Sequence, residues 1–114
     1  MAAFPAIHPD VAVIHALRAD AEGNAVIGDN QGVDCELALC ADTVIITAEE
    51  IVAELTKADI VAPLVHAVVS APAGARPTSC HPLYALDGEA LLAYTDQVSD
   101  PDTFNAFCSA HILQ

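Results

Sequence analysis

The first half of the chain alternates short apolar runs with polar turns, and each run has the length of a β-strand. Residues 11–17, VAVIHAL, are continuously apolar. Such a run predicts a strand covered on both faces, as in a parallel sheet. Residues 43–47, TVIIT, are rich in β-branched side chains and predict the clearest strand of the chain. A turn at Gly23-Asn24 precedes a third, shorter strand at residues 25–27.

The pattern changes after residue 60. Residues 60–62 and 64–69 predict two extended apolar segments divided by Pro63. The stretch from 71 to 84, APAGARPTSCHPLY, contains three prolines and a glycine, which exclude regular structure. We therefore expect a loop there.

Three stretches have the spacing of helices. Residues 33–41 place apolar side chains at helical spacing, with acidic side chains in the first turns, where the helix dipole favours them. Asp87 can cap a second helix, and Pro101 suits the first position of a third. The chain is therefore expected to end in two helices.

The order of elements is strand, turn, helix, strand, connection, strand, loop, helix and helix. This order predicts an α/β fold with a partial open, mostly parallel sheet, flanking helices and C-terminal helices. The 114 residues are enough for one domain, and we expect a single unit over residues 1–114.

The charge of the chain argues against two classes of partner. It has 16 acidic residues and only 3 Lys and Arg, which gives a formal net charge of −13. Nucleic acid and anionic membrane surfaces repel such a chain, so we expect neither as a partner.

No export signal or membrane span is expected. The most apolar window, residues 60–75, is interrupted by Pro63 and Pro72 and is shorter than the roughly 20 residues of a span. The first ten residues lack the basic segment and the long apolar run of a secretory signal. We expect a cytoplasmic protein whose four cysteines are reduced thiols.

Glu49 and Glu50 follow the predicted strand 43–47, where open α/β sheets often place their chemistry. A carboxylate there can act as a nucleophile or a general base. Two acidic residues before Ile51 are also typical of the first turn of a helix, and we favour this structural interpretation.

Other catalytic arrangements have weaker support. Ser79 or Cys80 with His81 or His66 as base would form a nucleophilic pair, but adjacent residues rarely reach the required geometry and no nucleophile motif surrounds them. His15 and His66 lie in apolar strands and are expected to be core or interface histidines.

Metal and phosphate sites are not expected either. The cysteines form no C-x-x-C pair, which structural zinc sites commonly need. The five glycines match no phosphate-binding spacing.

Four sequence blocks resemble the α subunit of family I CoA-transferases, of the glutaconate CoA-transferase type. They are IHPD at 7–10, VAVIHALRADAEGNAVI at 11–27, ADTVIITAEEIV at 41–52 and VHAVVSAPAGARPTSC at 65–80. The blocks keep the family's order and cover most of the chain. The resemblance implies the family's open α/β sheet. Because family α subunits are much longer, it also implies that this chain corresponds to their C-terminal portion.

The resemblance also implies that the catalytic residue lies outside this chain. In the family it is a glutamate of the partner β subunit, in the order Glu-Asn-Gly, whereas this chain has only Glu22-Gly23-Asn24, in an α-type turn. The implied reaction moves CoA through a thioester on that glutamate, so a CoA thioester is the substrate of the complex. We expect no catalytic residue in this chain, and no cofactor bound by it alone.

The long loop departs from the family's pattern, which is closer to Pro-Phe-Gly-Ala-His-Pro-Thr-Ser. Here Ala73 stands in place of the aromatic residue and Arg76 in place of the histidine. We expect a rigid loop that supports the heteromer interface or the substrate pocket. The candidate pocket or interface residues are Asn24, Glu49, Arg76, Thr78, Ser79 and Cys80.

The expected partners are a CoA-transferase β subunit and either the missing α N-terminal half or a second copy of this chain, because a partial sheet leaves apolar residues uncovered. Three alternatives remain open. They are a component of an acyl-CoA or ring-cleaving CoA-thioester hydrolase on the same fold, a non-catalytic assembly module, and an unrelated ligand-binding domain.

Overall fold

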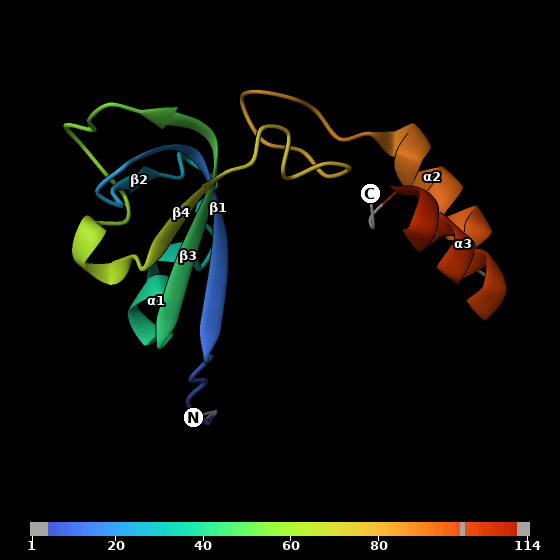
Figure 1. Ribbon diagram of the computed structural model, residues 1–114, viewed down its shortest axis with the longest axis horizontal. Helices are drawn as coiled ribbons and strands as arrows, with labels where there is room; N and C mark the ends of the chain where they lie inside the picture. Colours follow the sequence, from blue (N-terminus) through green and yellow to red (C-terminus); the bar gives the residue numbers. More distant parts are fainter. Residues whose placement is uncertain (1–4, 99, 112–114) are drawn as a thin grey trace, which may run out of the picture. The chain divides into compact units, whose positions relative to one another are not determined.

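The chain divides into two compact units, Met1–Gly74 and Ala75–Gln114 (Figure 1). The computed structural model describes residues 5–98 and 100–111. The expectation of a single unit over residues 1–114 stays a prediction.

The first unit contains a four-stranded sheet with the order β2-β1-β3-β4. Its strands are β1 (Val11–Asp20), β2 (Ala25–Val26), β3 (Thr43–Val52) and β4 (Ala67–Ser70). β3 runs parallel to both β1 and β4, and only the short β2 is antiparallel. The predicted mostly parallel, open sheet is therefore confirmed.

One face of the sheet carries the core. Along β1, Ala12, Ile14 and Ala16 are buried, while Val11 and Val13 on the other face are 52% and 60% exposed. The prediction that this strand is covered on both faces is therefore wrong for the described chain. The side chains on both faces of this strand are apolar, but the described residues bury only one of these faces.

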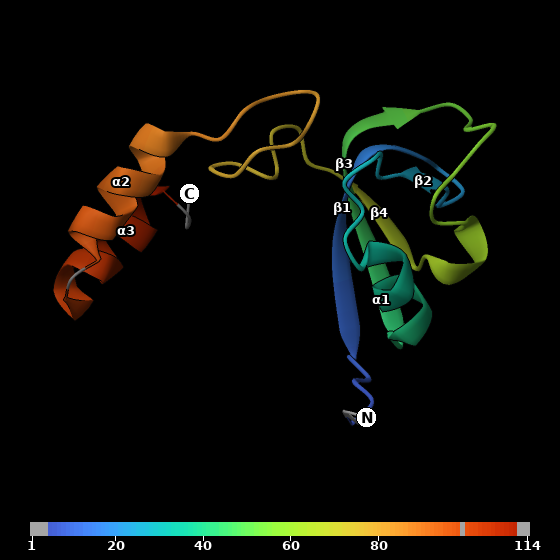
Figure 2. The ribbon, with the colours of Figure 1, turned by 180° about the vertical axis from the view of Figure 1, so that it is seen from behind.

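Helix α1 (Asp34–Cys40) packs against the covered face, as Figures 1 and 2 show. The largest side chains that are fully buried there are those of Ile46, Ile60 and Val44. Among the described residues, six of the eleven buried apolar residues are alanines. The layer between helix and sheet is therefore built mostly from small side chains.

The segment around Pro63 is less extended than the sequence predicts. Residues Ala62–Leu64 form a short 3-10 helix with Pro63 in its first turn, and β4 begins only at Ala67. The fixed φ angle of proline suits a helical first turn, which explains the difference.

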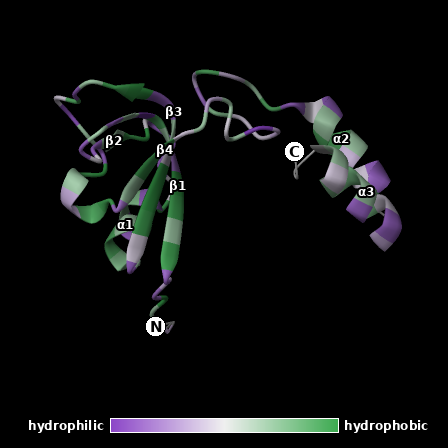
Figure 3. Cartoon of the chain, in the orientation of Figure 1, coloured by the Kyte–Doolittle hydropathy of each residue, from purple (hydrophilic) through white to green (hydrophobic). Residues whose placement is uncertain are grey.

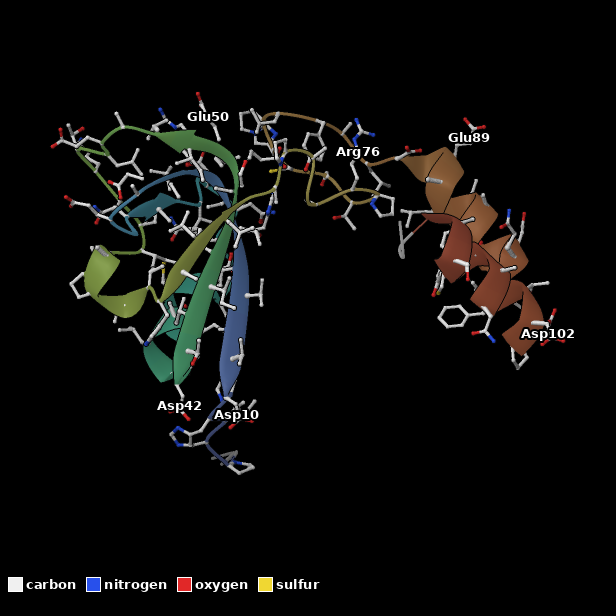
Figure 4. The ribbon with its side chains drawn as sticks, viewed as in Figure 1. Asp10, Asp42, Glu50, Arg76, Glu89 and Asp102 are labelled. Atoms are coloured by element: carbon white, nitrogen blue, oxygen red, sulfur yellow. The ribbon has the colours of Figure 1, made fainter. Side chains whose placement is uncertain are left out.

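The placement of Glu49 and Glu50 in a helical turn is also wrong, because β3 continues to Val52. Pairing with β1 extends the strand, and Glu50 lies opposite Arg18. Figure 4 shows the exposed Glu50 side chain pointing away from the sheet.

Asp20 ends β1 with a buried carboxylate that organises the following turn. Its Oδ1 accepts hydrogen bonds from the N–H groups of Glu22, Gly23 and Asn24 at 3.0–3.1 Å. Its Oδ2 accepts from the Asn24 amide at 3.0 Å and from the N–H of Leu55 at 3.1 Å. The Asn24 amide, followed by backbone N–H donors, holds the pKa of Asp20 below its ordinary value, while burial opposes this shift.

The second unit contains α2 (Gly88–Gln97) and α3 (Pro101–His111). The predicted cap is confirmed, because the Asp87 side chain accepts a hydrogen bond from the N–H of Ala90 at 3.0 Å. Tyr94 and Phe107 join the two helices through an edge-on ring contact at 5.2 Å between centroids. Among the described helices, none is long and apolar enough to cross a membrane.

We predict that Asp20→Asn lowers the melting temperature of the full chain at pH 7, and that the difference from wild type shrinks in acid. Because the pKa of Asp20 is lowered from 3.8, its carboxylate stabilises the fold fully above that pH. This contribution disappears as the pH falls through the folded-state pKa. Asp29→Asn, at an exposed position, is the matched control. Thermal melts at several pH values test this, and a gap independent of pH would contradict it.

Candidate functional site

A polar cluster lies on the exposed face of the sheet in the first unit. The pairing of β1 with β3 places His15 opposite Thr47, and Glu49 follows two residues later on the same face of β3. All three residues are partly buried, although they lie on the more open face of the sheet. The cluster therefore comes from the register of two parallel strands that are far apart in sequence.

The imidazole of His15 is held on both sides. Its Nδ1 lies 2.9 Å from Thr47 Oγ1, and its Nε2 lies 2.8 Å from Glu49 Oε1. A neutral ring satisfies this arrangement when Nε2–H donates to the carboxylate and Nδ1 accepts from the threonine hydroxyl. A protonated ring also satisfies it, because the hydroxyl can turn to the carbonyl of Ile14, 3.5 Å away.

The second carboxylate oxygen of Glu49 fixes the chain after β4. Glu49 Oε2 accepts a hydrogen bond from the N–H of Ala73 at 2.6 Å. Ala73 has a φ angle of 59°, in the left-handed region that alanine rarely adopts. The N–H of Ala71 donates to the carbonyl of Ala48 at 2.8 Å, so the segment is attached to β3 at two points.

Gly74 completes this attachment because its backbone lies directly on the histidine ring. A Cβ at this position would lie 2.9 Å from His15 Cε1 and 2.8 Å from the carbonyl oxygen of Ala71. Both distances are shorter than van der Waals contact. Glycine is therefore required here by close approach.

The chemistry of Glu49 follows from these contacts. Its side chain is only 8% exposed, and each oxygen accepts a hydrogen bond. Attack on a substrate would break these bonds and release both the imidazole and the loop. The arrangement instead fits a positioning residue, which holds the segment that leads from β4 into the long loop.

The other predicted site residues fall into separate groups. Asn24 belongs to the Asp20 turn, where its side-chain amide donates to Asp20 and its Oδ1 accepts from the N–H of Ala62 at 3.1 Å. This is a structural contact, and a role for Asn24 in a pocket or interface stays a prediction.

Arg76, in the second unit, is paired. Its guanidinium lies 3.6 Å from the Asp87 carboxylate and 5.1 Å from the centroid of the Tyr84 ring. The hydroxyl of Tyr84 accepts from the N–H of Ala75 at 3.1 Å. Arg76, Asp87, Leu91, Tyr94 and Phe107 also line a cavity of about 670 Å³ within this unit.

Thr78, Ser79 and Cys80 follow in the same loop. The Thr78 hydroxyl donates to the carbonyl of Ala75. The backbone of Cys80 exchanges hydrogen bonds with that of Tyr84 at 3.0 and 3.1 Å, which closes a tight turn, while Ser79 is exposed. The loop is thus tied internally by hydrogen bonds, whereas its rigidity and its role at an interface or pocket stay predictions.

Sequence reasoning missed His15 and Thr47 as members of a site. His15 was expected to fill a core or interface, and Thr47 was only part of a strand. The sequence did contain a signal, namely a histidine in one predicted strand and a Thr-x-Glu pattern in another. Whether these side chains meet depends on the register of the two strands, which a single sequence does not show.

Comparison with known proteins identifies the family. Residues 2–95 match the family described as malonate decarboxylase, alpha subunit, transporter. The chain belongs to this family.

Similarity to two named proteins also supports the resemblance that the sequence predicts. The chain is 37% identical over 116 residues to the α subunit of 3-oxoadipate CoA-transferase of Pseudomonas knackmussii, covering 98% of this chain and 41% of that protein. It is 37% identical over 117 residues to the α subunit of glutaconate CoA-transferase of Acidaminococcus fermentans, covering 97% and 37%. The predicted resemblance to CoA-transferase α subunits is confirmed.

Two solved structures share the fold. A variant of the decarboxylase AibA/AibB has a TM-score of 0.86 at 37% identity, covering 96% of this chain and 41% of that chain. Glutaconate CoA-transferase from Acidaminococcus fermentans has a TM-score of 0.84 at 37% identity, covering 89% and 34%. The chain thus spans about two fifths of the length of the relatives it matches, and the prediction that it matches their C-terminal portion stays a prediction.

We predict that Glu49→Ala destabilises the full chain by about 2 kcal/mol, because it removes the acceptor of both the His15 ring and the Ala73 N–H. Glu50→Ala, next to it at an exposed position, is the control and should change stability by less than about 0.5 kcal/mol. Urea unfolding measures both. Equal losses in the two variants would contradict a contribution of these two contacts to stability.

We also predict that Gly74→Ala costs about 1–3 kcal/mol, since the added methyl group collides with the His15 ring and the Ala71 backbone. Gly88→Ala is the matched control, because a Cβ there meets nothing within 4 Å. Calorimetry of both variants is the measurement. A Gly74→Ala variant as stable as wild type would rule out the close approach.

Proposed function

We propose that this chain forms part of a CoA-transferase α subunit. Together with a β subunit that carries the catalytic glutamate, it would transfer CoA between an acyl-CoA and a carboxylic acid. The observation that carries the proposal is the 37% identity to two CoA-transferase α subunits over nearly the whole chain.

In the proposed reaction, the partner's glutamate attacks the thioester carbonyl of the acyl-CoA. The C–S bond breaks, giving an acyl-glutamyl anhydride and CoA thiolate. The thiolate then attacks the glutamyl carbonyl of the anhydride and releases the first carboxylate, which leaves a glutamyl-CoA thioester. The acceptor carboxylate repeats the two steps in reverse, so that the glutamate is regenerated and no water is consumed.

In this proposal the chain forms one wall of the acyl pocket and does not supply the nucleophile. The His15–Glu49 pair holds Ala73 and Gly74 near the start of the loop at residues 71–84. The net charge of −13 makes this chain a poor seat for the phosphates of CoA, which we assign to other parts of the complex. No cofactor is assigned to this chain alone.

The names of the relatives suggest a substrate class. Glutaconate and 3-oxoadipate are both dicarboxylates, so we propose a dicarboxylyl-CoA or its free acid as one substrate. Partnership with a β subunit and a cytoplasmic location belong to the same proposal.

Decarboxylation is the second candidate function. The matched family is named for malonate decarboxylase, and the solved structure with a TM-score of 0.86 is a decarboxylase. The fold thus occurs in proteins named for either reaction. Thioester hydrolysis and a purely structural role remain alternatives without such a specific observation.

A chimera tests the proposal. This chain replaces the matched part of the glutaconate CoA-transferase α subunit from Acidaminococcus fermentans, and the chimera is coexpressed with the other subunit of that enzyme. We expect CoA transfer from glutaconyl-CoA to acetate above the level of a control in which the matched part of the α subunit is deleted.

Parallel assays separate the alternatives. Release of CO₂ without transfer would favour decarboxylation, and release of free CoA without acetyl-CoA would favour hydrolysis. A stable complex without any reaction would contradict the enzymatic proposal and favour an assembly module.

A further inference from the structure

The cavity of about 670 Å³ in the second unit has the size of a site for a small molecule. Pockets that bind small molecules commonly enclose about 300–1,000 Å³ and are mostly apolar, with a few polar groups that orient the ligand. Six of the nine described residues that line this cavity are apolar or aromatic, and Arg76, Asp87 and Gln97 are the polar ones. Tyr94 and Phe107, whose rings contact each other, form part of the wall. The cavity therefore has the composition of a binding site.

The cavity follows one face of α2. Its lining includes Asp87 before the helix, Ala90, Ala93 and Tyr94 in the middle, and Gln97 in the last turn. Residues three and four positions apart lie on the same face of a helix. At about 1.5 Å per residue, the 10 residues of α2 extend over about 15 Å. Figure 3 shows hydrophobic colour in the middle of α2 and hydrophilic colour at its start, so the cavity is elongated and has its charged groups at one end.

Arg76 is the cation at the charged end, and its side chain is 52% exposed. Its guanidinium nitrogen lies 3.6 Å from the Asp87 carboxylate, which is longer than the roughly 2.7–2.9 Å of a tight charge-assisted hydrogen bond. Its contact with the Tyr84 ring is a cation–π contact, which uses no N–H group as a donor to oxygen. Because a guanidinium carries several N–H donors in a planar fork, these contacts leave donors of Arg76 available to an added carboxylate.

The charges at this end favour an amphiphilic anion over a small one. Arg76 is the only Lys or Arg in residues 75–114. Asp87 is the acidic residue in the lining, and its other oxygen is held by the N–H of Ala90. Figure 4 shows Glu89 pointing away from α2 and α3. Because Asp87 weakens the attraction of Arg76 for a second carboxylate, burial of an apolar chain has to supply most of the affinity.

We propose that this cavity binds a medium-chain carboxylic acid as its anion. The carboxylate would pair with Arg76 at the start of α2, and the alkyl chain would lie along Ala90, Ala93 and Tyr94 toward Gln97. An uncharged apolar segment of polypeptide would leave the donors of Arg76 unused, and a small anion such as phosphate would leave the apolar wall in water. The inference concerns the second unit by itself, goes beyond the proposed function and does not depend on it.

Titration of the full chain with octanoate, followed by the NMR shifts of the backbone amides, tests the inference. We expect the largest shifts within residues 88–97. Octanoate should bind at least about tenfold more tightly than 1-octanol, which has the same chain length without the charge, because only the carboxylate can pair with Arg76. It should also bind at least about tenfold more tightly than acetate, which has the charge without the long chain.

Two variants remove the two parts of the site separately. Arg76→Gln should weaken octanoate binding by at least about tenfold and leave 1-octanol binding unchanged. Arg18→Gln removes the same charge at an exposed position of the first unit and is the matched control.

Ala93→Leu places a larger side chain in the lining of the cavity and should weaken binding of both octanoate and 1-octanol. Ala106→Leu makes the same change at an exposed alanine of α3 that does not line the cavity, and it should bind both as the wild type does. Thermal melts of all four variants show which of them fold. Ala93→Leu keeps the inference testable if Arg76→Gln does not.

Three results would overturn the inference. The first is equal affinity for octanoate and 1-octanol, and the second is octanoate binding that a folded Arg76→Gln or Ala93→Leu variant retains in full. The third comes from the chimera described above. If it assembles with the other subunit but no longer binds octanoate, polypeptide of the larger protein fills the cavity and a carboxylic acid is not its occupant.

Discussion

The parallel pairing of β1 with β3 determines almost everything else in the first unit. Because side chains alternate along both strands, this register places Ile14 and Ile46 in the core and His15 beside Thr47 on the opposite face. A shift by one residue would bury the polar cluster and expose the core. The same register brings Asp20 to the end of the sheet, where its carboxylate closes the next turn.

The sequence was sufficient to predict those elements whose formation depends on neighbouring residues. The β-branched run at 43–47, the cap at Asp87 and the proline at position 101 each depend on neighbouring residues, and the structure contains all three elements. The extension of β3 through Glu49 and Glu50 was not predictable in this way. Acidic residues favour a helical first turn locally, and only pairing with a strand 32 positions earlier outweighs that preference.

The polar cluster was even harder to predict from the sequence, because it also depends on the pairing of distant strands. A histidine in an apolar run is usually a core residue, and nothing near His15 in the sequence indicates a carboxylate partner. Its position after a predicted strand identified Glu49 as a candidate, but its hydrogen bonds fit a positioning residue rather than a reactive carboxylate. Its hydrogen bonds with the His15 ring and the Ala73 N–H join β3 to β1 and to the segment after β4, so its carboxylate holds these parts in place. The stretch from 71 to 84 could be recognised as a loop because its three prolines and its glycine are visible in the sequence, whereas the pairing of Arg76 with Asp87 required the fold.

The alanine-rich layer between α1 and the sheet has a thermodynamic consequence. An alanine side chain loses no rotamer entropy when it is buried, but it removes little apolar area from water. A core in which six of eleven buried apolar side chains are methyl groups therefore gains only modest stability from desolvation. Backbone and helix can approach closely, which makes the layer intolerant of larger side chains. For such a unit, each apolar contact added outside this layer makes up a comparatively large share of the total stability.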